Sequence, residues 1–225
     1  MDRLFRTRLL FGDVAIKKLK NATVMVVGCG AVGSFAIESL ARSGVGHIVV
    51  VDFDTVEETN INRQLFATCR TIGMPKVDVA ESRIHDISPD ILVDKFNMFW
   101  DADTDIDLRP DFIIDAIDSV PSKVALAQWA QAHNIPIIAS MGAALKTDIT
   151  KIQVGNLYKT SVCPLAGRVR KLARDAGVAD YPVVFSTEKS APVVGHAKNM
   201  GSIITVTGTF GLMLGGYVID KIIGE

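Results

Sequence analysis

The feature that most constrains the fold is a glycine-rich turn near the N-terminus. Gly28, Gly30 and Gly33 lie directly between an apolar run and an amphipathic segment, in "TVMVVGCGAVGSFAIESLARS", residues 23–43. Glycines at this spacing allow a tight turn from strand to helix, and they leave backbone N–H groups facing any phosphate oxygens near the helix N-terminus. The chain is therefore predicted to begin an α/β sheet with a nucleotide-binding turn.

The rest of the sequence continues the same alternation. Short apolar runs alternate with longer amphipathic stretches, the pattern of βαβ units in a mostly parallel sheet. We predict an α/β fold: a Rossmann-like, mostly parallel sheet with helices on both faces and a C-terminal α/β extension. Residues 1–140 form the nucleotide-binding core, and residues 141–225 complete the substrate site within the same single domain. The predicted strands are 23–28, 47–53, 91–97, 111–118 and 135–140, and the predicted helices of the core are 31–43, 75–88 and 121–133.

Composition excludes several classes of protein. The chain has 225 residues, 48% of them hydrophobic, enough to bury one substantial core. A formal net charge of -1 gives no overall excess of Lys and Arg for sequence-independent nucleic-acid binding. Cys29, Cys69 and Cys163 lie far apart, without the paired spacing of a zinc site or a disulfide framework. We expect a single domain in a reducing cytoplasm.

Neither end of the chain predicts export or membrane association. The N-terminal stretch "MDRLFRTRLLFGDVAIKKLK" is charged and broken by Gly12, so it lacks the apolar run of a secretory signal. Residues 202–223 approach the roughly 20 residues that span a bilayer, but four glycines, three threonines and Asp220 interrupt them. We predict a buried helix there, in the core or at a dimer seam.

The acidic residue after the second strand leaves the nucleotide undecided. Asp52 ends the apolar run 47–53 and is placed to accept hydrogen bonds from ribose hydroxyls, as in NAD enzymes. ATP would use the same carboxylate. A structural alternative is that the glycines only allow the helix to pack closely on the strand.

The residues after Asp52 favour ATP over NAD. Formation of an acyl-adenylate releases pyrophosphate with growing negative charge, which a guanidinium and an ammonium can neutralise in the transition state. Arg63 and Lys76 are the candidates for these two cations, and a nicotinamide site has no need of them. The polar side chains of this segment are Asp54, Asn60, Asn62, Arg63 and Gln64.

Asp118 supplies a candidate metal ligand. It ends the apolar run 111–118, in "DAIDS", where a carboxylate can hold Mg²⁺ against ATP phosphates. The alternative is an aspartate that caps the helix beginning near Pro121.

Together these motifs resemble the adenylating superfamily related to ubiquitin-activating enzyme, which includes ThiF, MoeB and HesA. The resemblance rests on "R-x-x-R-T" from Arg3 to Thr7, "GCGAVGS", "VDFDTVEETNINRQ", "GMPKV" and "DAIDS". It implies catalytic roles for Arg63, Lys76, Asp118 and Arg6, with Asp118 as the magnesium ligand and Arg6 reaching the ATP site of the other subunit of a homodimer. The nucleotide-binding set that it implies is Gly28, Gly30, Ala31, Gly33, Ser34, Asp52, Asp54, Asn60, Asn62, Arg63, Lys76, Asp118 and Ser119.

The C-terminal third looks like one branch of this superfamily, the tRNA threonylcarbamoyladenosine dehydratases. The stretches that carry this likeness are "DITKIQVGNLYKTSVCPLAGRVRKL", "VVFSTE" and "GSIITVTGTFG". The resemblance implies adenylation of the threonyl carboxylate at adenosine 37 of tRNA, then cyclisation with loss of water and release of AMP and pyrophosphate. The zinc-binding C-x-x-C pairs of sulfur-carrier activators are absent from the sequence. "SMGAALK", residues 140–146, stands where the resemblance implies a more glycine-rich turn.

Three other functions remain open from the sequence. These are an activator of the C-terminus of a ubiquitin-like sulfur-carrier protein, an adenylate-binding protein without turnover, and an NAD-dependent dehydrogenase. The expected ligands are ATP and Mg²⁺, with a monovalent cation (K⁺ or Na⁺) and a sulfur- or electron-transfer protein partner left open. A basic helix predicted over 163–177 is a candidate surface for tRNA phosphates or simply a solvated face. Residues 186–202, with Lys189 and His196, are predicted to form an irregular loop.

Overall fold

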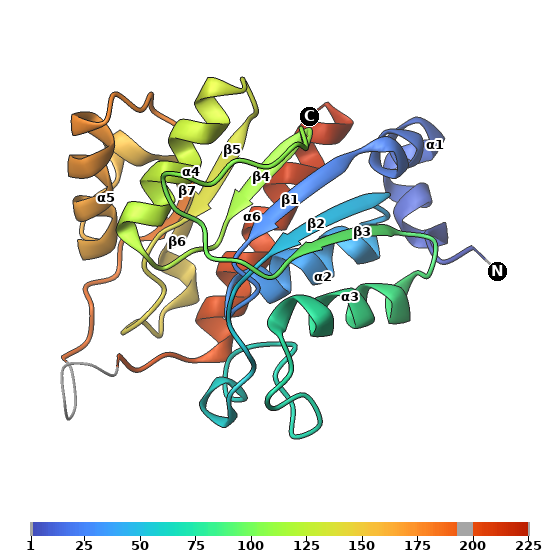
Figure 1. Cartoon of the computed structure of the whole chain (residues 1–225), viewed down its shortest axis with the longest axis horizontal. Coiled ribbons are helices and arrows are strands. Elements are labelled where there is room, and N and C mark those ends of the chain that lie inside the picture. Colours follow the sequence, from blue (N-terminus) through green and yellow to red (C-terminus); the bar gives the residue numbers. More distant parts are fainter. Residues whose placement is uncertain (1, 193–199, 225) are drawn as a thin grey trace.

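The computed structural model describes residues 2–192 and 200–224, and its centre is one seven-stranded sheet (Figure 1). The strand order is β3-β2-β1-β4-β5-β7-β6, and β6 is the antiparallel strand, paired with β7. The buried strands are rich in Val and Ile, as expected of parallel strands covered on both faces. The bounds are β1 Thr23–Val27, β2 His47–Val51, β3 Leu92–Phe96, β4 Phe112–Asp115, β5 Ile137–Ser140, β6 Ile152–Asn156 and β7 Pro182–Ser186.

Helices cover both faces of the sheet and bury a separate apolar cluster on each. One face carries α1 (Phe5–Asn21), α2 (Gly33–Ser43), α3 (Lys76–Ile87) and α6 (Ile204–Ile223). The other carries α4 (Val120–Ala132) and α5 (Pro164–Asp175), both visible at the left of Figure 1. The described residues also include the 3-10 turns η1 (Glu58–Asn60), η2 (Ile149–Lys151) and η3 (Leu157–Lys159). The predicted fold class is confirmed.

The apolar helix near the C-terminus is part of the core. Within the described residues α6 is the one helix long and apolar enough to cross a membrane, but 56% of its apolar window is buried inside the protein. Its glycines allow a close approach to α2, since a Cβ at Gly211 would lie 2.3 Å from the carbonyl oxygen of Val32. The buried faces of both helices therefore pack directly together, as predicted for a core helix.

The structure differs from the sequence-based prediction in three places. No strand was predicted at β7, which inserts between β5 and β6 and joins the C-terminal residues to the same sheet. The predicted strand 111–118 ends at Asp115, because the chain there turns towards α4. No helix was predicted at α1, which is divided by a kink at Gly12, where the backbone is not helical (φ 80°, ψ 173°). Residues 193–199, which include His196 of the predicted loop, lie outside the described residues.

Candidate nucleotide-binding site

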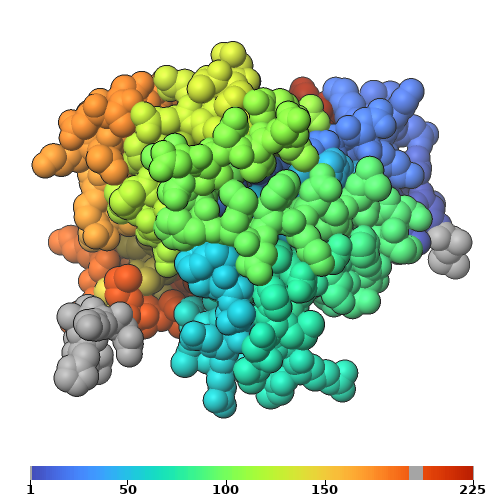
Figure 2. Space-filling view, in the orientation of Figure 1, coloured from blue at the N-terminus to red at the C-terminus, as the bar shows by residue number. Residues whose placement is uncertain are grey.

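The predicted site residues follow the C-terminal ends of β1, β2 and β4. β1 lies between β2 and β4, so the chain leaves the sheet in opposite directions on its two sides. In open α/β sheets, ligands bind in the crevice at such a point. The loop between β2 and α3 (cyan to teal) projects beyond the C-terminal ends of these strands in Figures 1 and 2.

The three glycines of the turn have two different roles. Gly28 has a φ of +97°, and a Cβ at Gly33 would lie 1.7 Å from the carbonyl oxygen of Gly28. Gly28 and Gly33 therefore serve the close packing of the turn and helix, which is the structural alternative to ligand binding. A Cβ at Gly30 would meet only the side chain of Gln64, at 3.7 Å from Nε2. The backbone N–H groups of Gly30 and Ala31 donate no hydrogen bond within the described part of the chain, so this side of the turn can receive an anionic ligand.

Asp52 is fixed beside the turn by two backbone groups. The residue is 8% exposed, and its Oδ2 and Oδ1 accept from the N–H groups of Cys29 (2.6 Å) and Asp54 (2.9 Å). Burial raises the pKa of Asp52, although Lys76 and the two N–H groups oppose that rise. The carboxylate retains lone pairs that can accept from ribose hydroxyls.

Two of the predicted cations are held by neighbouring groups. Lys76 is the first residue of α3 and is 7% exposed, and its Nζ lies 2.7 Å from Oδ2 of Asp54. The Arg63 guanidinium donates to the carbonyl oxygen of Thr59 (2.7 Å) and to Oδ1 of Asn62 (2.9 Å). Incoming phosphates would compete with a carboxylate for Lys76 and with neutral oxygens for Arg63.

Asp118 is exposed on the loop that leaves β4. Its side chain makes no hydrogen bond or ion pair within the described residues. It does not cap α4, whose N-cap residue is Ser119, so the capping alternative is not observed. The described residues hold no cluster of three or more potential metal ligands. A lone carboxylate suits Mg²⁺, which takes most of its ligands from phosphates and water.

Other predicted residues serve the loop or lie elsewhere. Ser34 is fully buried, and its Oγ accepts from the N–H of Leu65 at 3.1 Å, beneath the turn. The Asn60 Oδ1 caps its own 3-10 turn by accepting from Glu57. Asn62 donates to the carbonyl oxygen of Ser202 at 3.1 Å, which joins this loop to the segment before α6.

Arg6 lies far from the glycine turn of its own chain. It is exposed on α1, which leads into the start of β1, whereas the turn follows the end of that strand. Figure 1 shows α1 (blue) near the start of β1, at the opposite end of the strands from the β2–α3 loop. Within one chain, Arg6 is therefore not part of the site.

Two groups were not among the predicted site residues. Gln64 is 8% exposed and lies beside Gly30, and its only sequence signal was its place in "NINRQ". Asp115 and Lys123 form a fully buried ion pair behind Asp118, signalled only by the first aspartate of "DAIDS".

The basic helix α5 is divided between internal and external contacts. Arg170 donates to the carbonyl oxygen of Thr160 at 2.6 Å, and the Arg174 guanidinium lies over the ring of Tyr158 at 4.9 Å. Arg168 and Lys171 are exposed and can reach an anionic partner.

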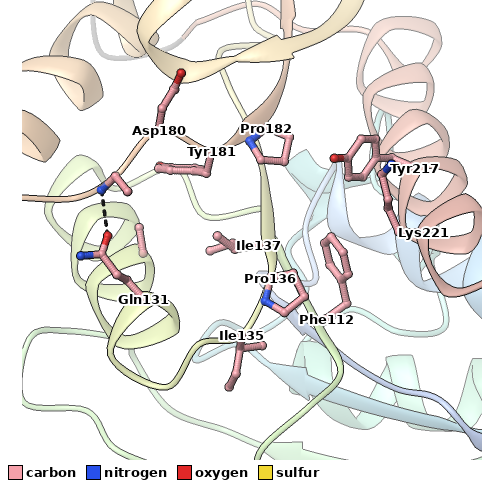
Figure 3. Close-up of a pocket in the computed structure, with 12 residues that line it drawn as sticks. Phe112, Gln131, Ile135, Pro136, Ile137, Asp180, Tyr181, Pro182, Tyr217 and Lys221 are labelled. Atoms are coloured by element: carbon pink, nitrogen blue, oxygen red, sulfur yellow. Dashed lines mark hydrogen bonds between the residues drawn. The ribbon is translucent and has the colours of Figure 1, made fainter. Parts of the chain in front are cut away.

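A cavity of about 360 Å³ lies at the N-terminal ends of β4, β5 and β7, opposite the strand ends that carry the predicted site (Figure 3). Its walls include Phe112, Pro136 and Pro182, which precede or begin parallel strands, together with Tyr217 and Lys221 of α6. None of the predicted site residues lines it, so this cavity is separate from the predicted nucleotide site at the strand C-termini.

Comparison with known proteins places the chain in a family. Residues 2–225 match the ThiF family. The chain is 43% identical over 198 residues to a tRNA threonylcarbamoyladenosine dehydratase of Bacillus subtilis, covering 86% of this chain and 77% of that protein. It is 32% identical to a sulfur carrier protein adenylyltransferase of Thermus thermophilus, over 61% of this chain and 52% of that protein. The crystal structure of the Escherichia coli tRNA N6-threonylcarbamoyladenosine dehydratase with ATP superposes with a TM-score of 0.91 at 34% identity, covering 98% of this chain and 93% of that one. The predicted resemblance is confirmed, and this chain belongs to the ThiF family.

Proposed function

We propose that the chain catalyses the ATP-dependent dehydration of N6-threonylcarbamoyladenosine at position 37 of tRNA. The observation that carries the proposal is the open side of the glycine turn, with the Asp52 carboxylate fixed beside it, in a chain that matches an ATP-bound dehydratase over nearly its whole length. The substrate follows from the names of the relatives, and the chemistry follows from the site.

Each residue of the site has a role in adenylation. Asp52 orients the ribose, and the N–H groups of Gly30 and Ala31 bind phosphate oxygens. Arg63 and Lys76 neutralise the pyrophosphate as it leaves. Asp118 would hold Mg²⁺, which supplies further charge neutralisation on the phosphates when bound.

The reaction requires no nucleophile from the protein. An oxygen of the threonyl carboxylate attacks the α-phosphorus of ATP, and the P–O bond to pyrophosphate breaks. The carbamoyl group of the same modification then attacks the activated acyl carbon and loses a proton to solvent, and AMP leaves with the former carboxylate oxygen. The proximity of the two groups favours this ring closure. Cys163, the cysteine beyond the nucleotide-binding core, is buried, and so is Cys29, whose thiol pKa is raised by burial, whereas Cys69 is exposed in the loop between β2 and α3.

The active form is proposed to be a homodimer in which Arg6 enters the ATP site of the other subunit. Its exposed position away from its own site supports this arrangement. Arg6→Ala and Lys76→Ala dimers should each be inactive, whereas mixed dimers should regain activity because one of their two sites has both residues. Mixed dimers with no activity would contradict the shared site.

The remaining partners belong to the same proposal. Arg168 and Lys171 of α5 are available to contact tRNA phosphates. A K⁺ or Na⁺ ion on backbone carbonyls of the C-terminal loops stays a prediction, as does a sulfur- or electron-transfer partner in the cytoplasm, since the dehydration itself transfers neither sulfur nor electrons. We retain Ser34, Asn60 and Asn62 as residues that shape the ATP loop.

The direct test is a change in nucleoside mass. The protein is incubated with ATP, Mg²⁺ and tRNA that carries threonylcarbamoyladenosine, and the tRNA is then digested under mild conditions. A nucleoside lighter by one water, formed together with AMP, is the expected product. The alternative is activation of a sulfur-carrier protein, suggested by the Thermus relative. ATP–pyrophosphate exchange stimulated by such a protein and not by tRNA would favour it.

A further inference from the structure

A buried ion pair lies directly behind Asp118. Asp115 is the last residue of β4, Lys123 is in the first turn of α4, and both side chains are fully buried with 2.9 Å between Oδ1 and Nζ. Lys123 Nζ also donates to the carbonyl oxygen of Ile117 at 2.9 Å, and Asp115 Oδ1 accepts from the N–H of Ile117 at 3.0 Å. The ion pair therefore holds both backbone groups of the residue that precedes Asp118.

The same turn packs against the glycine turn. The N–H of Ala116 donates to the carbonyl oxygen of Val27 at 2.8 Å, and a Cβ at Gly28 would lie 2.8 Å from the carbonyl oxygen of Ala116. Residues 115–118 are thus held by β1 on one side and by Lys123 on the other. The position of Asp118 relative to the glycine turn depends on both sets of contacts.

A buried ion pair is an expensive way to stabilise a fold. Moving two charges out of water costs free energy that their attraction regains only with good geometry and full hydrogen bonding. The Oδ2 of Asp115 is buried without a hydrogen-bond partner in the described structure, and burial raises the pKa of this carboxyl against the opposing effect of Lys123. Apolar side chains of similar volume often stabilise such a position as well or better. The pair therefore points to a role other than stability.

We propose that the Asp115–Lys123 pair is a positioning device that holds the Asp118 carboxylate where Mg²⁺ on the phosphates of ATP requires it. This inference rests on the proposed function, in which Asp118 acts beside ATP. Carboxylates that bind metals depend on partners that fix their orientation, and loss of such partners typically costs about 10- to 100-fold in metal affinity or activity. Asp115 and Lys123 touch neither substrate nor metal and act through the Asp118 loop.

The test replaces both charges at once, with Asp115→Leu and Lys123→Met. The double variant leaves no unpaired charge but removes the partners of the Ile117 N–H and carbonyl groups, so we expect it to fold and to unfold close to the wild-type temperature. It should bind metal-free ATP as the wild type does, measured by isothermal titration calorimetry. The Mg²⁺ concentration that half-saturates the metal-dependent gain in ATP affinity should rise about 10- to 100-fold. A folded double variant with the wild-type Mg²⁺ requirement overturns the proposal.

A control removes a partly exposed ion pair between helices α2 and α3. Glu38 of α2 accepts from Arg83 of α3 at 2.8 and 2.9 Å, and neither residue hydrogen-bonds to residues 115–118. Glu38→Leu with Arg83→Met should keep the wild-type Mg²⁺ requirement. If the Mg²⁺ requirement of this control rises equally, the effect is a general destabilisation of the fold, and the positioning role is refuted.

Two single variants complete the design. Lys123→Arg retains the charge but replaces a compact ammonium by a planar fork, so it should displace the Asp118 loop and raise the Mg²⁺ requirement even if the double variant does not fold. Asp118→Asn is the reference for complete loss of the metal effect. If Asp118→Asn retains that effect, the metal role of Asp118 and the positioning proposal both fall. If Asp118→Asn loses it while folded Lys123→Arg behaves as wild type, only the positioning proposal falls.

Discussion

Gly30 and Gly33 should respond in opposite ways to the addition of one methyl group. At Gly33 the new Cβ would lie 1.7 Å from the carbonyl oxygen of Gly28 and 3.2 Å from Cβ of Ala116. The nearer contact is with backbone, so α2 itself would have to move. At Gly30 the new Cβ would meet only the end of the flexible Gln64 side chain, at 3.7 Å.

These contacts set the expected magnitudes. Overpacking costs about 1–3 kcal/mol or more, and a chain of this size loses about 2–4 °C in Tm per kcal/mol. Gly33→Ala should therefore lower Tm by about 2–12 °C. Gly30 is not among the residues with positive φ, so Gly30→Ala should be neutral or stabilise by about 0.4–1 kcal/mol through the unfolded state. It should nevertheless weaken ATP binding, because the methyl group occupies the space through which phosphate approaches the backbone. Loss of one hydrogen bond to a charged group, about 1.5–3 kcal/mol, corresponds to about 10- to 150-fold in Kd.

Two measurements on each variant suffice, thermal unfolding by circular dichroism and ATP affinity by calorimetry. Gly30→Ala with wild-type affinity would falsify the assignment of the open side of the turn to phosphate. Gly33→Ala with an unchanged Tm would refute the packing role. A Gly30→Ala protein with a lower Tm than the wild type would show that its loss of ATP binding reflects impaired folding and not the ligand site.

Three further predictions concern the surrounding residues. Lys76→Ala and Arg63→Ala should each slow AMP formation by about 10²–10³-fold, since each removes one charge-stabilising donor from the transition state; a wild-type rate in either variant would contradict the triphosphate assignment. Burial raises the pKa of Asp52, and its ionised form accepts more strongly from ribose hydroxyls than its protonated form does. ATP affinity should therefore weaken as the pH drops through the raised pKa of Asp52. Titrations of the wild type and Asp52→Asn check this, because the variant should lack the dependence. Leu145 has a φ of +58°, in the left-handed region, so Leu145→Gly should relieve about 1 kcal/mol of strain and raise Tm, whereas Leu145→Val should lower it.

Local patterns were enough to predict the class of fold and the type of site. The switch from apolar runs to amphipathic stretches depends on residues close together in the chain, so it indicates strands and helices without knowledge of their partners. The glycine turn is also local, since strand, turn and helix are consecutive. Asp52 was predicted from its place at a strand end, and Lys76 from the need for a cation that neutralises the leaving pyrophosphate.

Long-range packing decided what local pattern could not. The place of β7 between β5 and β6 depends on pairing between distant segments, which its short apolar run does not encode. The distinction between Gly30 and Gly33 depends on Gly28 and Gln64, which approach these positions only in the folded chain.

The sequence by itself determined an α/β protein with a nucleotide-binding turn, because strand and helix periods and turn chemistry act over a few residues. Only the tertiary structure placed Arg6 away from its own turn and buried Lys123 against Asp115 behind Asp118. Those relations join separate elements across the sheet, and their geometry depends on how the whole core packs.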